Sequence, residues 1–156
     1  MEAVSQAFDL LQGEAQRFEQ ELSLQAHAEV MANFAHALVE FCARNPALIK
    51  IVIDETKQGG ERADWLQKTY LLPLHELATN FIQAISVYDE RKKNAQIAAQ
   101  IIPIIFGAAN FPFIDSDTLL AAHGADVFSK DYKAEHARLM AVLIHALMND
   151  HLQNAG

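Results

Sequence analysis

The sequence predicts an all-α fold, and three observations support that prediction. Apolar residues recur at spacings of three and four over most of the 156-residue chain. No stretch alternates apolar and polar residues over a length typical of a strand. The final segment, residues 131–152, is apolar around most of its circumference. We therefore expect one antiparallel helical domain of about six to seven helices over residues 1–156, with a leading helix in residues 1–23.

Composition and charge narrow the class of protein. Apolar residues make up 51% of the chain and charged residues 21%, which is typical of a globular domain. The formal net charge of -8 argues against binding to nucleic acid, because phosphate binding needs a concentrated basic surface. The early acidic residues are unlike a secretory signal, and the apolar runs are shorter than the roughly 20 residues that cross a bilayer. We therefore expect a soluble cytoplasmic protein with no membrane contact.

Two helices are predicted in the first part of the chain. Residues 4–22 have an amphipathic pattern that Gly13 weakens. Residues 24–44 carry a broad apolar stripe and should be largely buried. Within them Cys42 is the only cysteine, so an internal disulfide is excluded, and we predict a buried, unreactive thiol. Pro46 should end this helix and open the next one.

A short helix over residues 47–56 should stop at Gly59 and Gly60. The longest helical pattern follows, over residues 62–88, with a sustained inward face. Pro73 lies inside it and should bend the helix, which can open space beside the bend.

The next predicted helix covers residues 95–109, after a polar turn over 89–94 that holds the basic cluster at 91–93. It contains Pro103 and is weakened at Gly107, after which we expect an irregular connector.

The connector should contain one short helix over residues 117–123. Ser116 or Asp117 is predicted to cap its first turn, and Gly124 to stop it. The long helix over residues 131–152 follows.

This last helix carries two apolar stripes. One stripe is formed by Ala137, Met140, Ala141, Ile144 and Met148. The other is formed by Leu139, Val142, Leu143, Ala146 and Leu147. In a chain of this length, a helix that is apolar on two sides is expected to be covered by its own domain and by another chain. A second copy of the protein is the simplest partner, and we assign the first stripe to the dimer interface.

No motif predicts catalysis. No glutamate is followed by histidine three residues later, as a ferritin-like di-iron site requires, and phosphate-binding and nucleophile motifs are missing from the sequence. His36 and Glu40 are four residues apart and could chelate a metal, but a hydrogen bond on the helix surface explains the spacing as well. We therefore predict no catalytic residue, metal or cofactor. A helical enzyme or metal protein using His36, Glu40 and His75 is the alternative.

Bulky side chains on the long helices suggest a site for a small apolar ligand. Such sites are mostly apolar, contain a few polar groups and often lie between helices. The predicted lining residues are Phe34, Leu38, Phe41, Trp65, Tyr70, His75, Phe81 and Phe106. Phe111, His36, Thr69 and Asn110 accompany them in the pattern. The competing interpretation is a filled core in a purely structural dimerisation domain.

The order of four segments resembles the ligand-binding and dimerisation domain of tetracycline-repressor-like (TetR) transcriptional regulators. The segments are NPALIKIVIDE before a Gly-Gly break, RADWLQKTYLLPLHELA, IIPIIFGAANFPFI and AEHARLMAVLIHALM. Together they cover roughly residues 24–152, and the family-like region is taken as 24–156.

This resemblance implies that the helices around 95–106 and 133–152 form a four-helix bundle with their copies in a second subunit. Ile101 and Ile105 then join the predicted dimer interface. It also implies a small hydrophobic effector that controls DNA binding. Members of the family begin with a basic helix-turn-helix domain, which has no counterpart in this sequence, so the chain as given is expected not to bind an operator.

Overall fold

The computed structural model describes residues 6, 9–10, 12–13, 27–85 and 91–153, and the regular elements within these ranges are all helical. The predicted all-α class is confirmed. The described elements are α2 (His27–Arg44), α3 (Pro46–Gln58), α4 (Glu61–Leu66), a π-helical turn η1 (Gln67–Leu71), α5 (Leu72–Ile85), α6 (Arg91–Ile114), α7 (Ser116–His123) and α8 (Lys130–Gln153). Most of the helix predicted over residues 4–22 lies outside the described residues, and its five described positions are helical.

The predicted breaks between the first helices are confirmed. Pro46 occupies the first turn of α3, where its missing N–H costs no hydrogen bond. Gly59 and Gly60 have φ angles of 67° and 89°. Residues other than glycine adopt such angles only with strain. Gly124 ends α7 in the left-handed conformation at φ 65°, as predicted.

The helical pattern predicted over residues 62–88 contains an irregular turn that comes earlier than expected. We predicted a bend at Pro73, whereas the structure has a π-helical turn at Gln67–Leu71 directly before it. The N–H of Leu72 donates to the carbonyl of Gln67, five residues back. Pro73 has no N–H to donate, and a widened turn accommodates its ring against the preceding carbonyls. The predicted residues 86–88 lie outside the described residues.

Helix α6 is longer than predicted at both ends. It begins at Arg91, so the assignment of residues 91–94 to a turn was wrong. It then continues past Gly107 to Ile114 and contains both Pro103 and Pro112, so residues 110–114, predicted as part of the irregular connector, are helical. Contacts with α2, α3, α5, α7 and α8 hold α6, and tertiary packing of this kind overrides weak local helix propensity.

The predicted cap of α7 was one position too late. Asp115, rather than Ser116 or Asp117, is the N-cap residue, and its side chain makes no capping hydrogen bond. Only Asp115 separates α6 from α7, so the cap falls at the first residue after the long helix.

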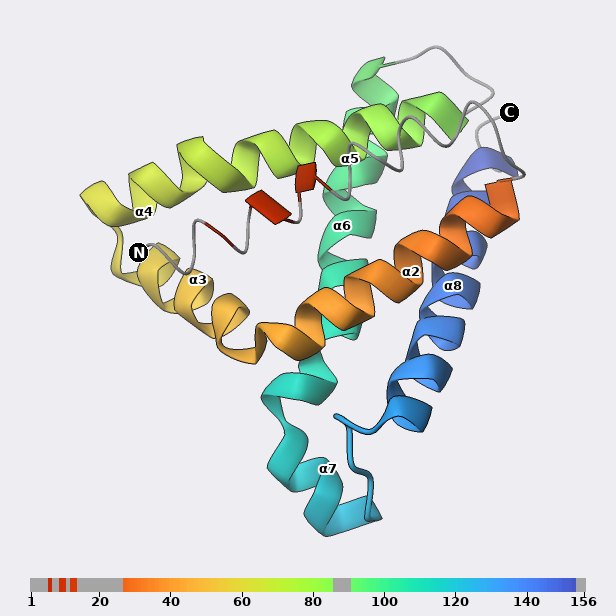
Figure 1. Ribbon diagram of the computed structural model, residues 1–156. Coiled ribbons are helices and arrows are strands. Elements are labelled where there is room, and N and C mark those ends of the chain that lie inside the picture. Colours follow the sequence, from red (N-terminus) through yellow and green to blue (C-terminus); the bar gives the residue numbers. More distant parts are fainter. Residues whose placement is uncertain (1–5, 7–8, 11, 14–26, 86–90, 154–156) are drawn as a thin grey trace.

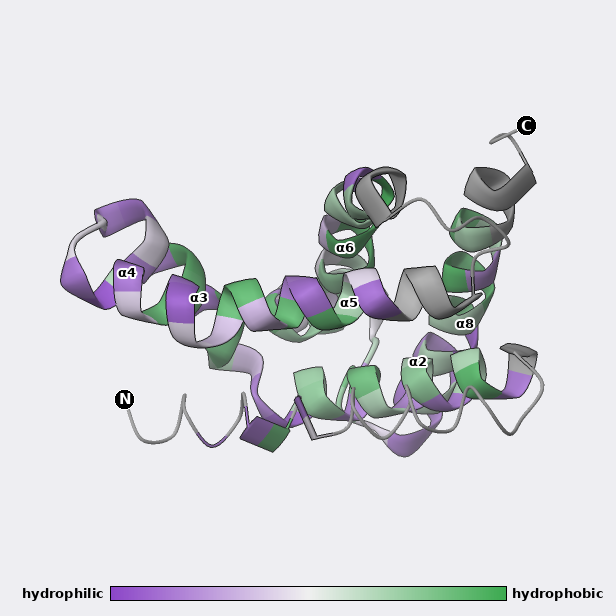
Figure 2. Ribbon diagram, turned by 90° about the horizontal axis from the view of Figure 1, so that it is seen from above, coloured by the Kyte–Doolittle hydropathy of each residue, from purple (hydrophilic) through white to green (hydrophobic). Residues whose placement is uncertain are grey.

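The helices form a triangular frame beside an antiparallel pair (Figure 1). Helix α2, helix α3 and the α4–η1–α5 rod outline the triangle, and α6 passes behind it. Helices α6 and α8 run in opposite directions, and α2 crosses both and packs chiefly against α8. Seen from above, α2 lies on one side of the α6–α8 pair (Figure 2).

The buried apolar residues form two clusters. The main core lies where α2, α6 and α8 meet. A smaller cluster at the corner of α3, α4 and η1 consists of Leu48, Val52, Leu66 and Tyr70. Phe41, near the end of α2, packs against both clusters and joins them.

Helix α6 also corrects the prediction about apolar length. Its 20-residue segment Ala95–Ile114 has a mean hydropathy of 1.8 and is long and apolar enough to cross a membrane. We expected shorter apolar runs because the uninterrupted apolar stretches of the sequence, such as Ile101–Ala109, are much shorter. A core helix passes the same test, and 39% of this segment is buried inside the domain. The contacts of α6 with five other helices identify it as the central helix of the fold.

Candidate functional site

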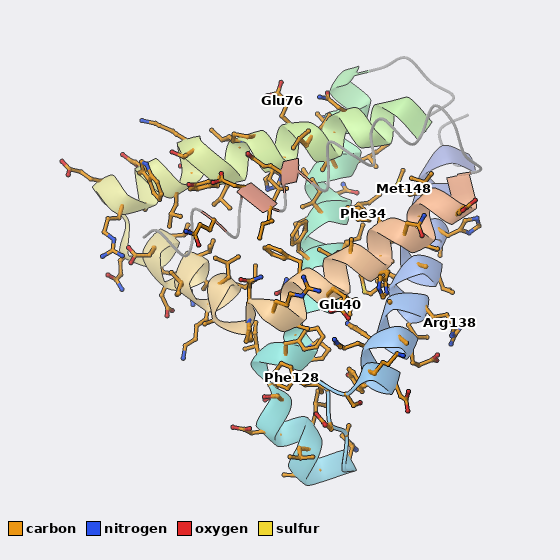
Figure 3. All side chains as sticks on the ribbon, viewed as in Figure 1. Phe34, Glu40, Glu76, Phe128, Arg138 and Met148 are labelled. Carbon is orange, nitrogen blue, oxygen red and sulfur yellow. The ribbon has the colours of Figure 1, made fainter. Side chains whose placement is uncertain are left out.

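The first apolar stripe of α8 belongs to the core of the single chain. Ala137, Met140, Ile144 and Met148 are each at most 6% exposed, and Ala141 packs against them. Figure 3 shows Met148 on the side of α8 that faces α2. Ile101 and Ile105 of α6 are buried in the same core, at 1% and 8% exposure. These residues leave almost no surface for a second chain, which argues against assigning the dimer interface to them.

The second stripe of α8 is exposed only in part, because its members Leu143 and Leu147 pack against the main core. Leu139 and Val142 are 50% and 56% exposed, and Ala146 lies on the same side of the helix. Arg138, nearby on the surface, donates two hydrogen bonds, of 2.8 and 2.6 Å, to the carboxylate of Glu135. In Figure 3 Arg138 points away from α2. Leu139, Val142 and Ala146 therefore lie on the outer side of α8, close to an ion pair.

Helix α6 has a matching outer stripe. Ile104 and Phe111 are 48% and 61% exposed and stand seven residues apart, which places them on one side of the helix. Gly107 lies between them and faces open space where a side chain would begin. Both stripes lie opposite the buried residues of their own helices, on neighbouring helices. We call these four side chains, Leu139, Val142, Ile104 and Phe111, the outer apolar surface. Large apolar side chains exposed on two neighbouring helices are candidates for a contact with another protein.

An ion pair links α2 to the first turn of α8. The Nζ atom of Lys133 lies 2.8 Å from Oε1 of Glu40, and both side chains are 23% exposed. Arg44 approaches Oε2 of Glu40 at 3.7 Å. The hydrogen bond from Lys133 is the main reason why the pKa of Glu40 lies below its usual range.

These contacts bear on the metal hypothesis for His36 and Glu40. His36 is exposed, and the carboxylate of Glu40 is directed to Lys133 and Arg44. Within the described part of the chain, no group of three or more metal-ligating side chains comes together. The alternative enzyme or metal protein thus gains no support from this pair.

The predicted ligand-lining residues divide between the two clusters. Leu38 is fully buried in the main core, and Phe34, Phe41 and Phe106 are half-buried against it. Tyr70 is buried in the smaller cluster, and the half-buried Trp65 lies edge-on to it with ring centroids 5.2 Å apart. Phe41 contacts both clusters, so the structure brings these six residues to one connected apolar interior.

Two predicted lining residues are not part of this interior as described. His75 is exposed on α5. The side chain of Phe81 lies outside the described part of the chain. Asn110, which the sequence pattern placed among the polar companions of the aromatic residues, is buried at 2% exposure. Asn110 could be selected from the sequence because it is a polar residue with apolar neighbours in an apolar helix.

Aromatic residues also gather where α6 ends and α8 begins. The ring of Phe113 lies 5.8 Å from that of Phe128 and 6.0 Å from that of His136. The Nε2 atom of His136 is 3.4 Å from the carbonyl of Ala109. This group joins the ends of the two helices and contains no pairing of a nucleophile with a base.

The thiol of Cys42 lies inside the main core, as predicted. It is fully buried, and this burial raises its pKa to about 12. Because the thiolate is the reactive form, the thiol should be inert in the folded protein.

No protein-family model, no curated protein and no solved structure matches this chain. The resemblance to TetR-like regulators therefore remains a prediction from the order of its segments.

Proposed function

We propose that this domain binds a small apolar effector and forms a homodimer, as the regulatory domain of a TetR-like cytoplasmic transcriptional regulator. The DNA-binding function would belong to a domain that this sequence does not contain. The outer apolar surface is the observation that carries the proposal. Helices α6 and α8 fill the core with one side and expose large apolar side chains on the other.

The composition of this surface favours a second copy of the chain as the partner. It consists of Leu139, Val142, Ile104 and Phe111, and α8 also carries the exposed charged side chains of Glu135 and Arg138. Interfaces between protein chains combine such apolar side chains with charged ones at the rim. Two neighbouring antiparallel helices can meet the same pair in a second copy across a two-fold axis, which would give a bundle of four helices.

The connected apolar interior contains five aromatic side chains and is called the aromatic interior. It supports effector binding. Phe41 and Phe106 are half-buried, so each keeps part of its ring area outside the packed core. Helix α2 carries Phe34 and Phe41 and also packs against α8. A ligand that contacts these rings would therefore act on the helix that supports the proposed dimer surface, which is a direct route for coupling the two sites.

The dimer is tested by measuring the mass of the wild-type protein and of Leu139→Glu by sedimentation velocity. We expect a wild-type dimer and a weakening of about 100-fold or more in the variant, because the dimer would bury an unpaired charge. Leu72→Glu is the matched control, since Leu72 of α5 is equally exposed but lies away from the outer apolar surface. A monomeric wild-type protein at high micromolar concentration would refute the proposal. Equal dissociation of both variants would refute the choice of surface.

A further inference from the structure

Asn110 of α6 is buried with only half of its side-chain amide satisfied. Its Nδ2 atom donates a 3.1 Å hydrogen bond to the carbonyl of Phe106, one turn earlier. Its Oδ1 atom accepts no hydrogen bond from any residue in the described ranges 27–85 and 91–153. Since nearly all buried polar atoms in folded proteins have a partner, a donor for this oxygen is expected.

Asn110 stands one helical turn from Phe106, one of the predicted ligand-lining residues. Because Nδ2 turns back toward the backbone of α6, Oδ1 of the same planar group is directed away from that carbonyl. Phe106 stands one turn away on the same side of the helix and is half-buried against the main core. A buried hydrogen-bond acceptor therefore shares one side of α6 with a ring assigned to effector binding.

The surroundings of Asn110 also restrict the charge of a ligand. Asn110 is the only buried polar or charged residue within the described part of the chain. A charged ligand placed beside it would lose its hydration without gaining an opposite charge. A neutral ligand with one donor group would satisfy the oxygen and leave its remaining surface to apolar contacts.

We propose that Oδ1 of Asn110 accepts a hydrogen bond from a neutral, largely apolar ligand that carries a hydroxyl or N–H group. This contact selects such ligands over equally apolar molecules that lack a donor, because the latter leave the buried oxygen unpaired. The inference rests on the proposed function, since it names the chemical class of the effector.

The experiment compares 4-octylphenol with its methyl ether, 4-octylanisole. The two probes have similar size and apolar area, but only the phenol can donate. Each is titrated into the full chain while the fluorescence of Trp65, the single tryptophan, is recorded. We expect the phenol to bind the wild-type protein about tenfold more tightly than the ether.

The variant Asn110→Leu should bind both probes with affinities within about twofold of each other, because leucine accepts no hydrogen bond. Asn45→Leu is the control. The Nδ2 atom of Asn45 donates to the carbonyl of Phe41 four residues earlier, in the same pattern, at the end of α2. This control variant should keep the wild-type preference for the phenol.

Each outcome distinguishes the inference from the proposed function. Equal binding of both probes by the wild-type protein overturns the role of Asn110 and leaves effector binding intact. A preference for the phenol that persists in Asn110→Leu also overturns the role of Asn110. If neither probe binds the wild-type protein, both proposals fail for this class of ligand. The wild-type comparison needs no substitution, so the test does not depend on the folding of the variant.

Discussion

The two apolar sides of α8 have similar side chains and opposite surroundings. On the inner side Ile144 and Met140 are almost completely buried against α2 and α6. On the outer side Leu139 and Val142 keep at least half of their surface in contact with solvent. Hydrophobicity alone therefore predicts that both sides of α8 are buried in a contact. The structure shows that the single chain buries only the inner side.

This difference separates folding from assembly. A change on the inner side should act on the free energy of unfolding, because those residues hold three helices together. A change on the outer side should act on association and leave the subunit folded. Helix α6 repeats the division, with Ile101 inside and Phe111 outside. Matched substitutions on the two sides therefore test whether folding and assembly are separate.

The largest expected effect comes from Ile144→Glu on the inner side. The carboxylate would be buried without a partner among apolar residues, and the free energy of unfolding should fall by more than about 4 kcal/mol. Urea unfolding followed by circular dichroism measures this loss. The Leu139→Glu protein should unfold with a wild-type midpoint when both proteins are compared as monomers. A folded, stable Ile144→Glu monomer would contradict the placement of Ile144 in the core.

A smaller effect is expected for Phe111→Ala on the outer side of α6. Truncating a large exposed ring should leave the monomer stability within about 0.5 kcal/mol of the wild type. If Phe111 lies in the proposed interface, the dimer should weaken about tenfold or more, because truncated aromatic side chains often cost over 1 kcal/mol at interfaces. Dilution experiments by sedimentation give the dissociation constant. Leu120→Ala on α7 is the control, since Leu120 is exposed outside the proposed surface.

An unchanged dissociation constant for Phe111→Ala, together with dissociation by Leu139→Glu, would restrict the interface to α8. The four-helix arrangement would then be wrong, while the dimer itself would stand.

The sequence was sufficient to predict the helices and most of their breaks. Spacing of apolar residues identified each long helix, and Pro46, Gly59 and Gly124 marked turns that the structure confirms. Residues that weaken helices locally led to a wrong helix end in α6, where contacts with other helices stabilise the helix. Gly107 and Pro112 weaken a helix in isolation, but α6 contacts five other helices and continues through both residues.

The candidate site was harder to predict because periodicity gives the direction of a side chain and not its neighbour. Two stripes were visible on the last helix, but the pattern did not tell which one α2 covers, and the stripe first assigned to a partner is the inner one. The aromatic set shows the same limit. Tyr70 and Leu38 are buried as expected of interior residues, whereas His75, on the same long helical pattern, is exposed.

The smallest effect is expected from the polar contact between α2 and α8. Lys133→Met removes the ion pair with Glu40 but leaves Arg44 nearby, so a loss of about 0.5–1 kcal/mol is expected at pH 7. The pKa of Glu40 is lower in the folded protein than in the unfolded chain, where it is about 4.3. The stabilisation by this pair is therefore complete above about pH 5 and is lost as the pH falls through the lower pKa of the folded state.

Unfolding measured in urea from pH 7 down to about pH 3 should show the wild type and Lys133→Met converging at the acid end. Arg138→Met is the matched control, because its partner Glu135 is on the surface and their pair should contribute little at any pH. A constant difference between wild type and Lys133→Met over the whole range would mean that the lysine stabilises α8 by packing of its aliphatic part. The ion pair would then contribute nothing to holding α8 on α2, and the link between the aromatic interior and the outer apolar surface would depend on the apolar contacts of the main core alone.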